Sequence, residues 1–508
     1  MITSNNIKFV GAGLLLTTLL WLINSLNYGN QLFALHSTQA HDRGDVASYR
    51  HSQPPTVWEL KAHGLKNLGE AVEISTLYVQ AVESLIEPDL IQEMDVPLPH
   101  FSSWEVDSTS DPASFASSIV NIAEMPRQID ASSIIFGVAT NLERLADSLD
   151  AFAHWAGDTG AIIVANLEVV QQSLDQEKLV KSLTIEEVLT RAASLSIKLV
   201  IRESPQPFID RYISLIQVLH EEATLQSTTS NQTITWTGII DDDTFFLSTN
   251  RLLTMLSKFD PVKPHYIGSL SEDLNGVTSW GIIAYGGAGV FLSMPLLTQL
   301  QPHLPDCLTP PAISGDQRIA ECIYKHTSTK LSIDPRMHQL DMMGDHTGFY
   351  EAVRPLPLTV HHWKSWAHYD MVLVTAVSAI TGEDSILQKY RLANGWWMTH
   401  GFSIVKYSDE EDEDEHEDAS RVDSRTWLSH REGAMEHTFN NGDTDQVDYD
   451  RFLMHSLGPF RPPDKAKQQY LIESAVKEND NTITLYYVHR QDGVATNVIR
   501  VIWTRAWN

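Results

Sequence analysis

The sequence predicts an α/β fold built on a mostly parallel, Rossmann-like sheet. From about residue 130 onward, apolar runs of strand length alternate with stretches of helical spacing. Strands that alternate with helices in this way usually form a parallel sheet with helices packed on its faces. The chain has 508 residues, of which 43% are hydrophobic, so it can bury a large core.

The alternation can be followed element by element. Four apolar runs rich in β-branched residues are predicted as strands, at 133–139, 161–165, 197–201 and 234–240. Three stretches with apolar residues at helical spacing separate them, at 141–155, 184–194 and 208–222. Each strand is therefore followed by a crossover helix until the last strand is reached.

Other parts of the chain follow different patterns. Residues 27–128 are predicted as a stem and N-terminal region with an amphipathic helix near 71–86. The α/β domain is expected to span 129–375, and a β-rich C-terminal extension to span 376–508, with strands at 482–489 and 498–504. Nine of the ten residues at 409–418 are acidic, which indicates a solvated loop.

The formal net charge of −29 limits the possible partners. A field of this sign opposes binding to nucleic acid or to an anionic membrane surface. An anionic substrate would need a metal ion or local basic groups to be held.

The N-terminus carries an apolar run at 9–26, which is just long enough to cross a thin bilayer as a helix. Lys8 precedes the run and no Lys or Arg follows before Arg43. This asymmetry predicts a cytosolic tail at 1–8 and a lumenal body. A cleaved signal peptide is the alternative, but no convincing Ala-x-Ala site follows the run.

Two weaker signs agree with a lumenal body. Asn231 begins an Asn-Gln-Thr sequon for N-glycosylation. Cys307 and Cys322 are the only cysteines, and they could form a disulfide in an oxidising compartment. Two buried free thiols are the alternative.

Three consecutive aspartates, Asp241, Asp242 and Asp243, end the strand predicted at 234–240. Carboxylates that leave a buried strand together repel one another unless a cation lies among them. Mg²⁺ and Mn²⁺ prefer such oxygen ligands and bind phosphate oxygens as well. The pattern therefore indicates a metal–diphosphate site at the carboxyl end of a strand. An acidic turn that caps the next helix is the alternative.

Three features follow downstream. An apolar strand from Trp280 is predicted to enter a turn containing Gly286 and Gly287, which would let the backbone approach a substrate, and a helix is predicted at 290–300. Asp316 opens another predicted helix, where it could simply be a cap. The pair at 361–362, His-His, follows a short extended run and could supply an imidazole to Mn²⁺ or be ordinary polar structure.

In this order the motifs resemble those of the fringe-like β-1,3-glycosyltransferases, over about residues 130–370. The matching motifs are the Trp-containing strand ending in Asp-Asp-Asp, then Tyr-Ile-Gly, Gly-Gly-Ala-Gly, a cysteine, an acidic helix start, a second cysteine and His-His-Trp. The resemblance implies a GT-A fold, a nucleotide-sugar donor (usually a UDP-sugar), Mn²⁺ or Mg²⁺, and a Golgi protein with one N-terminal anchor (type II).

The resemblance also implies roles for single residues. Asp241 and Asp243 match the outer aspartates of an Asp-x-Asp motif that binds the metal, and His361 matches a late metal-binding histidine. His362 is the alternative ligand because the pair makes the alignment ambiguous. Asp316 matches the catalytic base, although the family commonly has two acids where this chain has Gly-Asp. The remaining expected contacts are Asp242, Thr140 and Arg144 with the nucleotide sugar, and Trp280, Gly286, Gly287 and His362 with substrate.

The predicted function is therefore metal-dependent, inverting transfer of a hexose from a nucleotide sugar to a hydroxyl of a glycan or glycoprotein. Two alternatives remain. One is a non-catalytic lumenal protein of the same fold that binds sugars or nucleotides. The other is a metal-dependent phosphohydrolase of the haloacid-dehalogenase kind, which would need Thr or Val where this chain has Phe245.

Overall fold

The computed structural model describes most of the chain after residue 56. The described residues are 57–94, 96, 98, 101–103, 116–126, 128–169, 183–230, 232–309, 314–344, 346–407 and 467–506, with three two-residue strands between 435 and 461. Four predicted features lie outside the described residues: the tail at 1–8, the apolar run at 9–26, the acidic loop at 409–418 and Asn231.

A seven-stranded sheet forms the centre of the α/β part, in the order β12-β10-β11-β8-β5-β6-β7. The neighbours β7, β6, β5 and β8 are parallel, whereas β11 is antiparallel to β8 and to β10. The strand bounds are β5 Ile134–Thr140, β6 Ile162–Glu168, β7 Lys198–Ser204, β8 Trp236–Ile240, β10 Tyr266–Gly268, β11 Val290–Ser293 and β12 Leu331–Ile333. The predicted mostly parallel, Rossmann-like α/β fold class is confirmed.

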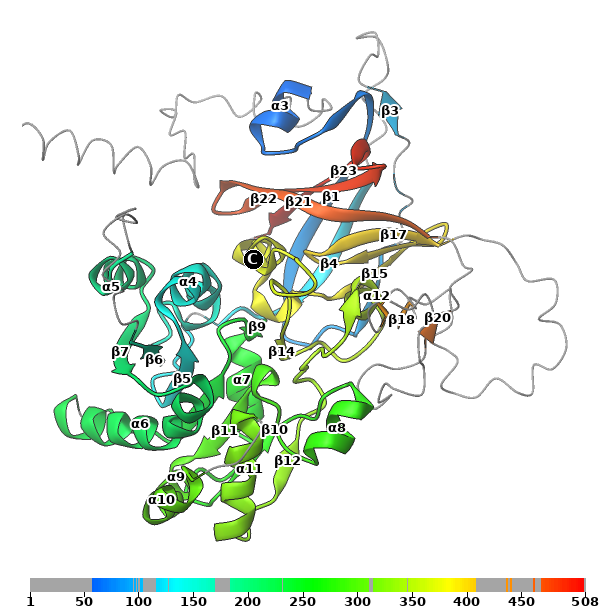
Figure 1. The fold of residues 1–508 in the computed structure, drawn as a ribbon. Helices are drawn as coiled ribbons and strands as arrows, with labels where there is room; N and C mark the ends of the chain where they lie inside the picture. Colours follow the sequence, from blue (N-terminus) through cyan, green and yellow to red (C-terminus); the bar gives the residue numbers. More distant parts are fainter. Residues whose placement is uncertain are drawn as a thin grey trace, which may run out of the picture. The chain divides into compact units, whose positions relative to one another are not determined.

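Helices cover both faces of this sheet (Figure 1). One face packs on α4 (Leu142–Ala156), α5 (Ile185–Ser194) and α7 (Thr249–Leu256). The other face packs on α6 (Phe208–Thr229), α9 (Met294–Leu300) and α11 (Gly315–His326), and the short α10 (Leu304–Cys307) belongs to the same side. All seven residues of β5 are buried, as expected for a central parallel strand covered on both faces.

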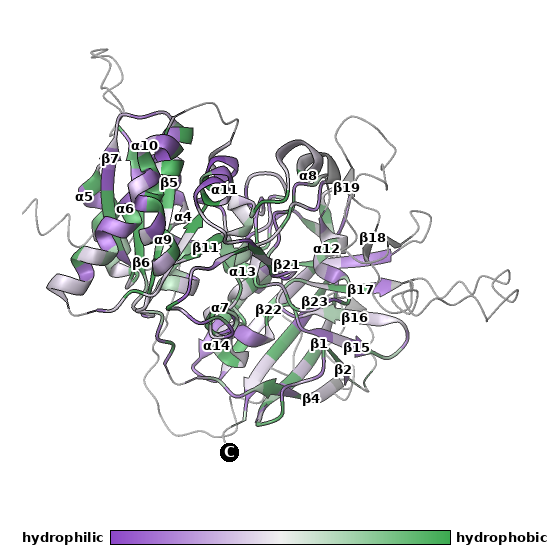
Figure 2. Cartoon of the chain, turned by 90° about the horizontal axis from the view of Figure 1, so that it is seen from below, coloured by the Kyte–Doolittle hydropathy of each residue, from purple (hydrophilic) through white to green (hydrophobic). Residues whose placement is uncertain are grey.

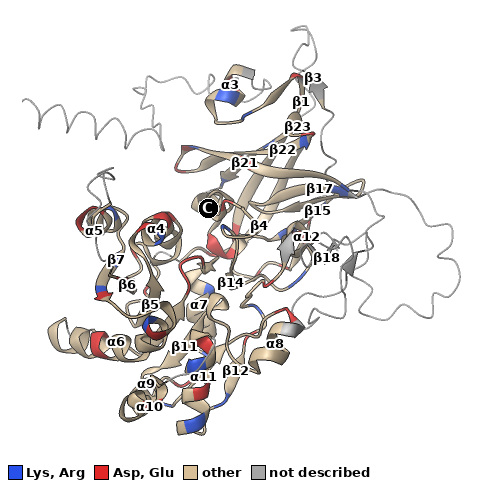
Figure 3. Ribbon diagram, viewed as in Figure 1, with Lys and Arg blue, Asp and Glu red and all other residues tan. Residues whose placement is uncertain are grey.

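Local sequence signals set the ends of several helices. The Asn141 side chain accepts a hydrogen bond from the backbone of Arg144 at the start of α4. At the start of α5, Thr184 and Glu187 form a capping box. Hydrophobic strands and mixed helices are visible in Figure 2. Figure 3 shows charged positions on the ribbons of several helices, among them α4, α6 and α11.

The other helices are short. They are α3 Val57–Ala62, α8 Leu274–Trp280, α12 Thr347–Glu351, α13 Met371–Thr375 and α14 Ser378–Thr381, with 3₁₀ turns at Gly286–Ala288, Gln301–His303 and Glu383–Ser385.

A second, ten-stranded sheet joins segments from both ends of the chain. Its order is β2-β15-β16-β17-β21-β22-β23-β1-β3, and β4 also pairs with β1. The parallel partners β1 (blue in Figure 1) and β23 (red) are more than 400 residues apart in the sequence. The bounds are β1 Leu68–Ser84, β2 Ile91–Met94, β3 Ser102–Ser103, β4 Ala116–Ala123, β15 Lys389–Leu392, β16 Trp396–Thr399, β17 Ser403–Tyr407, β21 Lys467–Asn479, β22 Thr482–Gln491 and β23 Val494–Arg505.

The two ends of this sheet contact one another through side chains. The amide of Gln92 on β2 donates to the carbonyl of Asn121 on β4 at 2.8 Å and accepts from its N–H at 3.1 Å. These bonds occupy backbone groups of an edge strand that would otherwise be free to pair with another chain. Small two-stranded pairings complete the structure: β9 (Phe245–Phe246) with β14 (Thr359–Val360), β13 (Met343–Gly344) with β19 (Phe439–Asn440), and β18 (Met435–Glu436) with β20 (Phe460–Arg461).

Three sequence-based predictions about the helices, strands and domain boundary are wrong. The amphipathic helix expected near 71–86 is the long strand β1, because its β-branched residues pair with β23. The strand expected from Trp280 into the glycine turn is absent; the strand β11 follows that turn and α9 follows β11. The N-terminal strands also share one sheet with the C-terminal strands, so a boundary at residue 128 separates partners.

The predicted location, a single-pass Golgi membrane protein, is also corrected. A helix needs about 20 mostly apolar residues to cross the hydrocarbon core of a bilayer. Within the described residues, no helix combines sufficient length with sufficient hydrophobicity.

Candidate metal centre

The aspartate triplet lies where the chain order of the parallel sheet reverses. The strands β5, β6 and β7 are laid out in one direction, and β8 is placed on the other side of β5. Ligands of open α/β sheets bind outside the carboxyl ends of the strands at such a switch point. Asp241, Asp242 and Asp243 directly follow β8, and Thr140 ends the neighbouring β5.

A tight turn holds the triplet. The N–H of Thr244 donates to the carbonyl of Asp241 at 3.1 Å, and the Thr244 hydroxyl accepts from the N–H of Asp241 at 3.0 Å. The same hydroxyl donates to the carbonyl of Gly287 at 2.9 Å, which joins the triplet to the glycine turn. The aspartates are therefore part of a rigid, hydrogen-bonded turn.

His361 reaches the triplet through a small strand pairing. Phe245 and Phe246, directly after the triplet, pair antiparallel with Val360 and Thr359. This register places the residue after Val360 beside the residues before Phe245. A short extended run and an acidic turn, over 100 residues apart in the sequence, are thereby brought together.

Three potential ligand atoms converge at this point. His361 Nε2 lies 2.9 Å from Asp243 Oδ1 and 3.5 Å from Asp241 Oδ2. His361 Nδ1 lies 3.0 Å from the carbonyl of Gln339, so Nδ1–H donates there and Nε2 faces the carboxylates. This donor set, two carboxylates and an imidazole nitrogen, fits a divalent cation such as Mn²⁺.

The electrostatics of the cluster agree with that fit. Burial raises the pKa of Asp241 to about 7; His361 opposes the rise, and the nearby Asp243 and Asp316 add to it. Burial alone would raise the pKa of Asp243, but hydrogen bonds from His361 and Ser365 hold it well below its usual range. A cation among these groups would relieve the repulsion between Asp241 and the other carboxylates.

Asp242 points to a different set of partners. Arg144 binds it through two bonds, Nε to Oδ2 at 2.6 Å and Nη2 to Oδ1 at 2.5 Å, and the Thr140 hydroxyl also donates to it. This pairing raises the pKa of Arg144 above its ordinary value. Lys364 lies nearby and donates to Ser148 at 2.8 Å, and Ser148 in turn donates to the carbonyl of Asp242. The structure thus brings together the three residues predicted to contact the nucleotide.

Asp316 lies across the glycine turn from the triplet. Its Oδ2 accepts from the N–H of Gly286 at 3.1 Å, and its Oδ1 accepts from the N–H of Gln317 at 2.9 Å and from the Ser314 hydroxyl. The N-cap residue of the helix is Ser314, and Asp316 adds a bond to the first-turn N–H of Gln317 while its other oxygen reaches Gly286. Asp316 remains partly exposed.

The two cysteines hold the helix that carries Asp316 in its first turn. Cys307 and Cys322 form a disulfide with their Cα atoms 5.2 Å apart. The bond joins α10 to α11, so it braces α11 behind Asp316.

The two glycines make room for protein side chains. A β-carbon at Gly286 would lie 2.1 Å from the hydroxyl of Tyr212, and one at Gly287 would lie 2.2 Å from Nδ1 of His361. Tyr212 and His361 therefore make the close approach to these glycines in the β-carbon direction, and the substrate contact stays a prediction. Any larger residue at either position would displace the turn or its neighbour.

Two predicted site residues take other places. Trp280 ends α8 and packs, partly buried, against the hydrophobic cluster on the α6 face of the sheet. The ring nitrogens of His362 face Ser365 at 3.0 Å and Asp341 at 3.2 Å. His362 is near the centre, since ligand atoms of Asp243, His361 and His362 lie within 4.8 Å of one another.

Sequence reasoning missed several residues of the centre. Lys364 and Ser365 could have been suspected because they directly follow His-His-Trp. Tyr212, Gln339 and Asp341 carry no signal of their own, because only the fold brings them to the aspartates.

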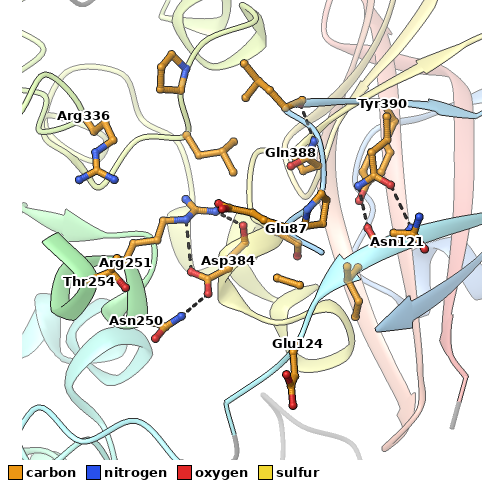
Figure 4. A pocket seen from close by; sticks show the side chains of 18 residues that line it. Glu87, Asn121, Glu124, Asn250, Arg251, Thr254, Arg336, Asp384, Gln388 and Tyr390 are labelled. Atoms are coloured by element: carbon orange, nitrogen blue, oxygen red, sulfur yellow. Dashed lines mark hydrogen bonds and ion pairs between the residues drawn. The ribbon is translucent and has the colours of Figure 1, made fainter. Parts of the chain in front are cut away.

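A cavity of about 640 Å³ lies away from these residues (Figure 4). Its polar side chains largely satisfy one another: Asn250 donates to Asp384 at 2.6 Å, and Gln388 donates to the carbonyl of Asp89 at 2.7 Å. Arg251 also lies against Asp384, with Nε 3.4 Å from Oδ1. None of the predicted site residues lines this cavity. We interpret this cavity as a structural feature and not as the functional site.

Comparison with known proteins gives one family match and several similar folds. The family described as "Protein of unknown function, DUF604" matches residues 275–379, which include Asp316 and His361. No curated protein matches the chain.

The solved structures that the chain is similar to include three glycosyltransferases. GlyE of Streptococcus pneumoniae is 11% identical over 51% of this chain and 62% of its own, with a TM-score of 0.29. Mouse xyloside xylosyltransferase 1 is 10% identical over 39% of this chain and 84% of its own (TM-score 0.25). The mannosyltransferase PcManGT from Pyrobaculum calidifontis, solved with GDP-Man and Mn²⁺, is 13% identical over 42% of this chain and 57% of its own (TM-score 0.25). The chain thus spans less than two thirds of GlyE and of PcManGT. At this level of similarity, function has to be argued from the site.

Proposed function

We propose that this protein is a metal-dependent glycosyltransferase. It would move a hexose from a nucleotide sugar, a UDP-sugar, to a hydroxyl of a glycan or glycoprotein, with inversion at the anomeric carbon. The observation that carries the proposal is the convergence of Asp241, Asp243 and His361 at the switch point of a parallel sheet, with Asp316 across the glycine turn. The β-1,3 linkage and the membership of the fringe-like family rest on the sequence resemblance.

Asp241, Asp243 and His361 would hold the metal ion. The imidazole favours Mn²⁺ over Mg²⁺, since Mg²⁺ binds almost entirely through oxygen. When bound, the ion would neutralise charge on the diphosphate of the donor and of the departing nucleotide. With a net charge of −29, the chain needs such a cation to hold an anionic donor.

Two basic residues would complete the donor site. Arg144 is anchored by Asp242 but keeps 55% of its side chain exposed, so its remaining donors are open to the diphosphate or ribose. The Lys364 ammonium is half-buried beside the triplet. Asp242 would then orient Arg144 in addition to lying close to the sugar.

Asp316 would act as the general base. Three donors orient its carboxylate, and a carboxylate has about four lone-pair positions, so one remains for an acceptor hydroxyl. It would take the hydroxyl proton as the acceptor oxygen bonds to the anomeric carbon and the nucleoside diphosphate leaves from the opposite face. Asp316 Oδ2 accepts from the N–H of Gly286, and Oδ1 of Asp241 lies 3.6 Å from where a β-carbon of Gly286 would be, so the base and a metal ligand would both border this glycine.

Two variants separate these roles. Asp243→Ala should abolish Mn²⁺-dependent binding of UDP in calorimetry. Asp316→Ala should keep UDP binding and lower turnover by about 100-fold or more, the usual contribution of a general base. The control is Glu321→Ala, which removes an exposed carboxylate from the same helix as Asp316.

The same assay tests the alternatives. Release of UDP from UDP-sugars with Mn²⁺ is expected for the wild type. A binding protein would bind UDP and release none, and a phosphohydrolase would release inorganic phosphate instead. Either result, or full turnover by Asp316→Ala, would contradict the proposal.

A further inference from the structure

A chain of hydrogen bonds runs from Asp341 to the back of the metal centre. Asp341 Oδ1 lies 3.2 Å from Nε2 of His362, and Nδ1 of His362 lies 3.0 Å from the hydroxyl of Ser365. That hydroxyl donates to Oδ2 of Asp243 at 2.7 Å. The other oxygen of the same carboxylate, Oδ1, faces His361.

The direction of these bonds follows from the proton count of Ser365. A hydroxyl has one proton, and it goes to Asp243, whose carboxylate can only accept. The contact with His362 therefore needs a proton on Nδ1, which donates to Ser365. Because a carboxylate only accepts, Nε2 of His362 bonds to Asp341 only when the ring carries a second proton; the neutral ring with its proton on Nδ1 keeps the bond to Ser365, and its Nε2 then only lies beside Asp341.

The far end of the chain is held firmly. Asp341 accepts from the hydroxyl of Ser271 at 2.7 Å and from the amide of Gln339 at 3.2 Å. The ring of His362 stacks on Trp366 with centroids 3.5 Å apart and planes 7° apart. Its orientation is therefore set by contacts on three sides.

The backbone is strained at this place as well. His362 has φ of 54° and Leu340, next to Asp341, has φ of 56°. Residues other than glycine keep such left-handed conformations only where the surrounding structure imposes them. In this conformation the side chain of His362 contacts Ser365 and Asp341, while its neighbour His361 faces the carboxylates.

We propose that His362 is a positioning residue for the metal centre and not a ligand. Through Ser365 it holds Oδ2 of Asp243, which leaves Oδ1 for the cation beside Nε2 of His361. This inference rests on the metal site of the proposed function. It separates two adjacent histidines that the sequence leaves equivalent: His361 binds the ion, and His362 orients the carboxylate that binds it.

Binding of Mn²⁺ to the full chain tests this assignment without any substrate. The variants are His361→Ala, His362→Ala, Ser365→Ala, the double variant of the last two, and Ser365→Thr, which keeps the hydroxyl. Calorimetry measures affinity, electron spin-echo spectroscopy detects nitrogen bound to Mn²⁺, and thermal unfolding shows that each variant is folded.

The expected results follow from the hydrogen-bond chain. Loss of a hydrogen-bonding partner of a metal ligand typically lowers affinity by about 10- to 100-fold. His362→Ala and Ser365→Ala should each lose affinity by that order. The double variant should lose no more than the stronger single, because both act through one bond. Ser365→Thr should recover most of the affinity, and the nitrogen signal should vanish only in His361→Ala.

Several results would overturn the assignment. They are unchanged affinity in Ser365→Ala, additive losses in the double variant, or loss of the nitrogen signal in His362→Ala with its retention in His361→Ala. Wild-type protein that binds no Mn²⁺ would instead overturn the proposed function together with this inference. Wild-type binding that is lost in His361→Ala but unaffected by Ser365→Ala would overturn the inference alone.

Discussion

Replacement of Gly286 by alanine tests how tightly the glycine turn is packed. The added β-carbon would lie 2.1 Å from the hydroxyl oxygen of Tyr212 and 3.1 Å from Cζ of the same ring. The φ angle of Gly286 is outside the left-handed region, so the backbone itself accepts alanine. Most of the penalty should therefore come from the hydroxyl oxygen of Tyr212, and a smaller part from Cζ.

The expected size can be worked out from these contacts. Overpacking of a closed site usually costs about 1–3 kcal/mol of stability, and we expect a loss in this range for Gly286→Ala. Displacing the turn also breaks the bond from Gly286 to Asp316, so turnover should fall as well. Tyr212→Phe removes the colliding oxygen and leaves ring atoms 3.1 Å away, a tight contact that small shifts can relieve.

The phenylalanine variant should be nearly neutral alone. Within the described residues, the buried hydroxyl of Tyr212 has no hydrogen-bond partner, so its removal should change stability by less than about 1 kcal/mol. Urea unfolding and UDP release are measured for the wild type, both single variants and the double variant. The double variant should recover most of the loss, with a coupling of about 1–2 kcal/mol.

Gly276→Ala is the control. Its β-carbon would meet Ser271 at an ordinary 3.5 Å, so no coupling to Tyr212→Phe is expected. If Gly286→Ala and Tyr212→Phe proved additive in both stability and turnover, the packing argument would be refuted.

Three further predictions concern other parts of the chain. Gly287→Ala should abolish Mn²⁺ binding in calorimetry, because its β-carbon would lie 2.2 Å from Nδ1 of His361; retained affinity would contradict the geometry. Replacing Cys307 and Cys322 together by serine should lower the free energy of unfolding by about 3 kcal/mol, the value for a 15-residue loop, in urea titrations without reductant; an unchanged midpoint would count against the bridge. Burial lowers the pKa of His400 to about 3. In the unfolded chain His400 binds a proton near pH 6.5, whereas in the folded chain it stays neutral down to about pH 3. The free energy of unfolding should therefore fall by up to about 1.4 kcal/mol per pH unit as the pH drops from 6.5 towards 3. His400→Gln should flatten that slope, and equal slopes in both proteins would disprove the assignment.

The parallel sheet could be predicted from the sequence because each strand–helix unit is local. The four strands β5 to β8 and the helices between them appear in the structure close to their predicted bounds. Apolar runs and helical spacing report burial within one segment, which is what these units share.

The strand β1 shows why other elements could not be predicted. Its apolar positions fit a partner that lies more than 400 residues away, as in the pairing of Leu77 with Val501. Within the segment alone, the spacing of Val72, Thr76 and Val79 resembles a helical face. Only the distant pairing decides for a strand, and no local pattern contains that information.

The candidate site divides in the same way. The aspartate triplet is conspicuous in the sequence because neighbouring carboxylates need an explanation. Gln339 and Tyr212 are not conspicuous, since a glutamine carbonyl or a buried tyrosine has no meaning until the fold places it beside His361 or Gly286. The sequence thus indicated the residues that we propose as ligands, and the structure added the groups that contact them.

The packing of the glycine turn also restricts how a donor can reach the metal centre. In the direction of a β-carbon, Tyr212 fills the space at Gly286 and His361 fills it at Gly287, so no substrate can enter from there. Of the three proposed ligands, His361 and Asp243 each expose 4% of their side chains, whereas Asp241 exposes 31%. Under the proposed function, a diphosphate that shares the ion would therefore arrive past Asp241. Substitution of Asp241 should consequently weaken nucleotide binding beyond its effect on the metal alone, because it forms the open wall of the centre.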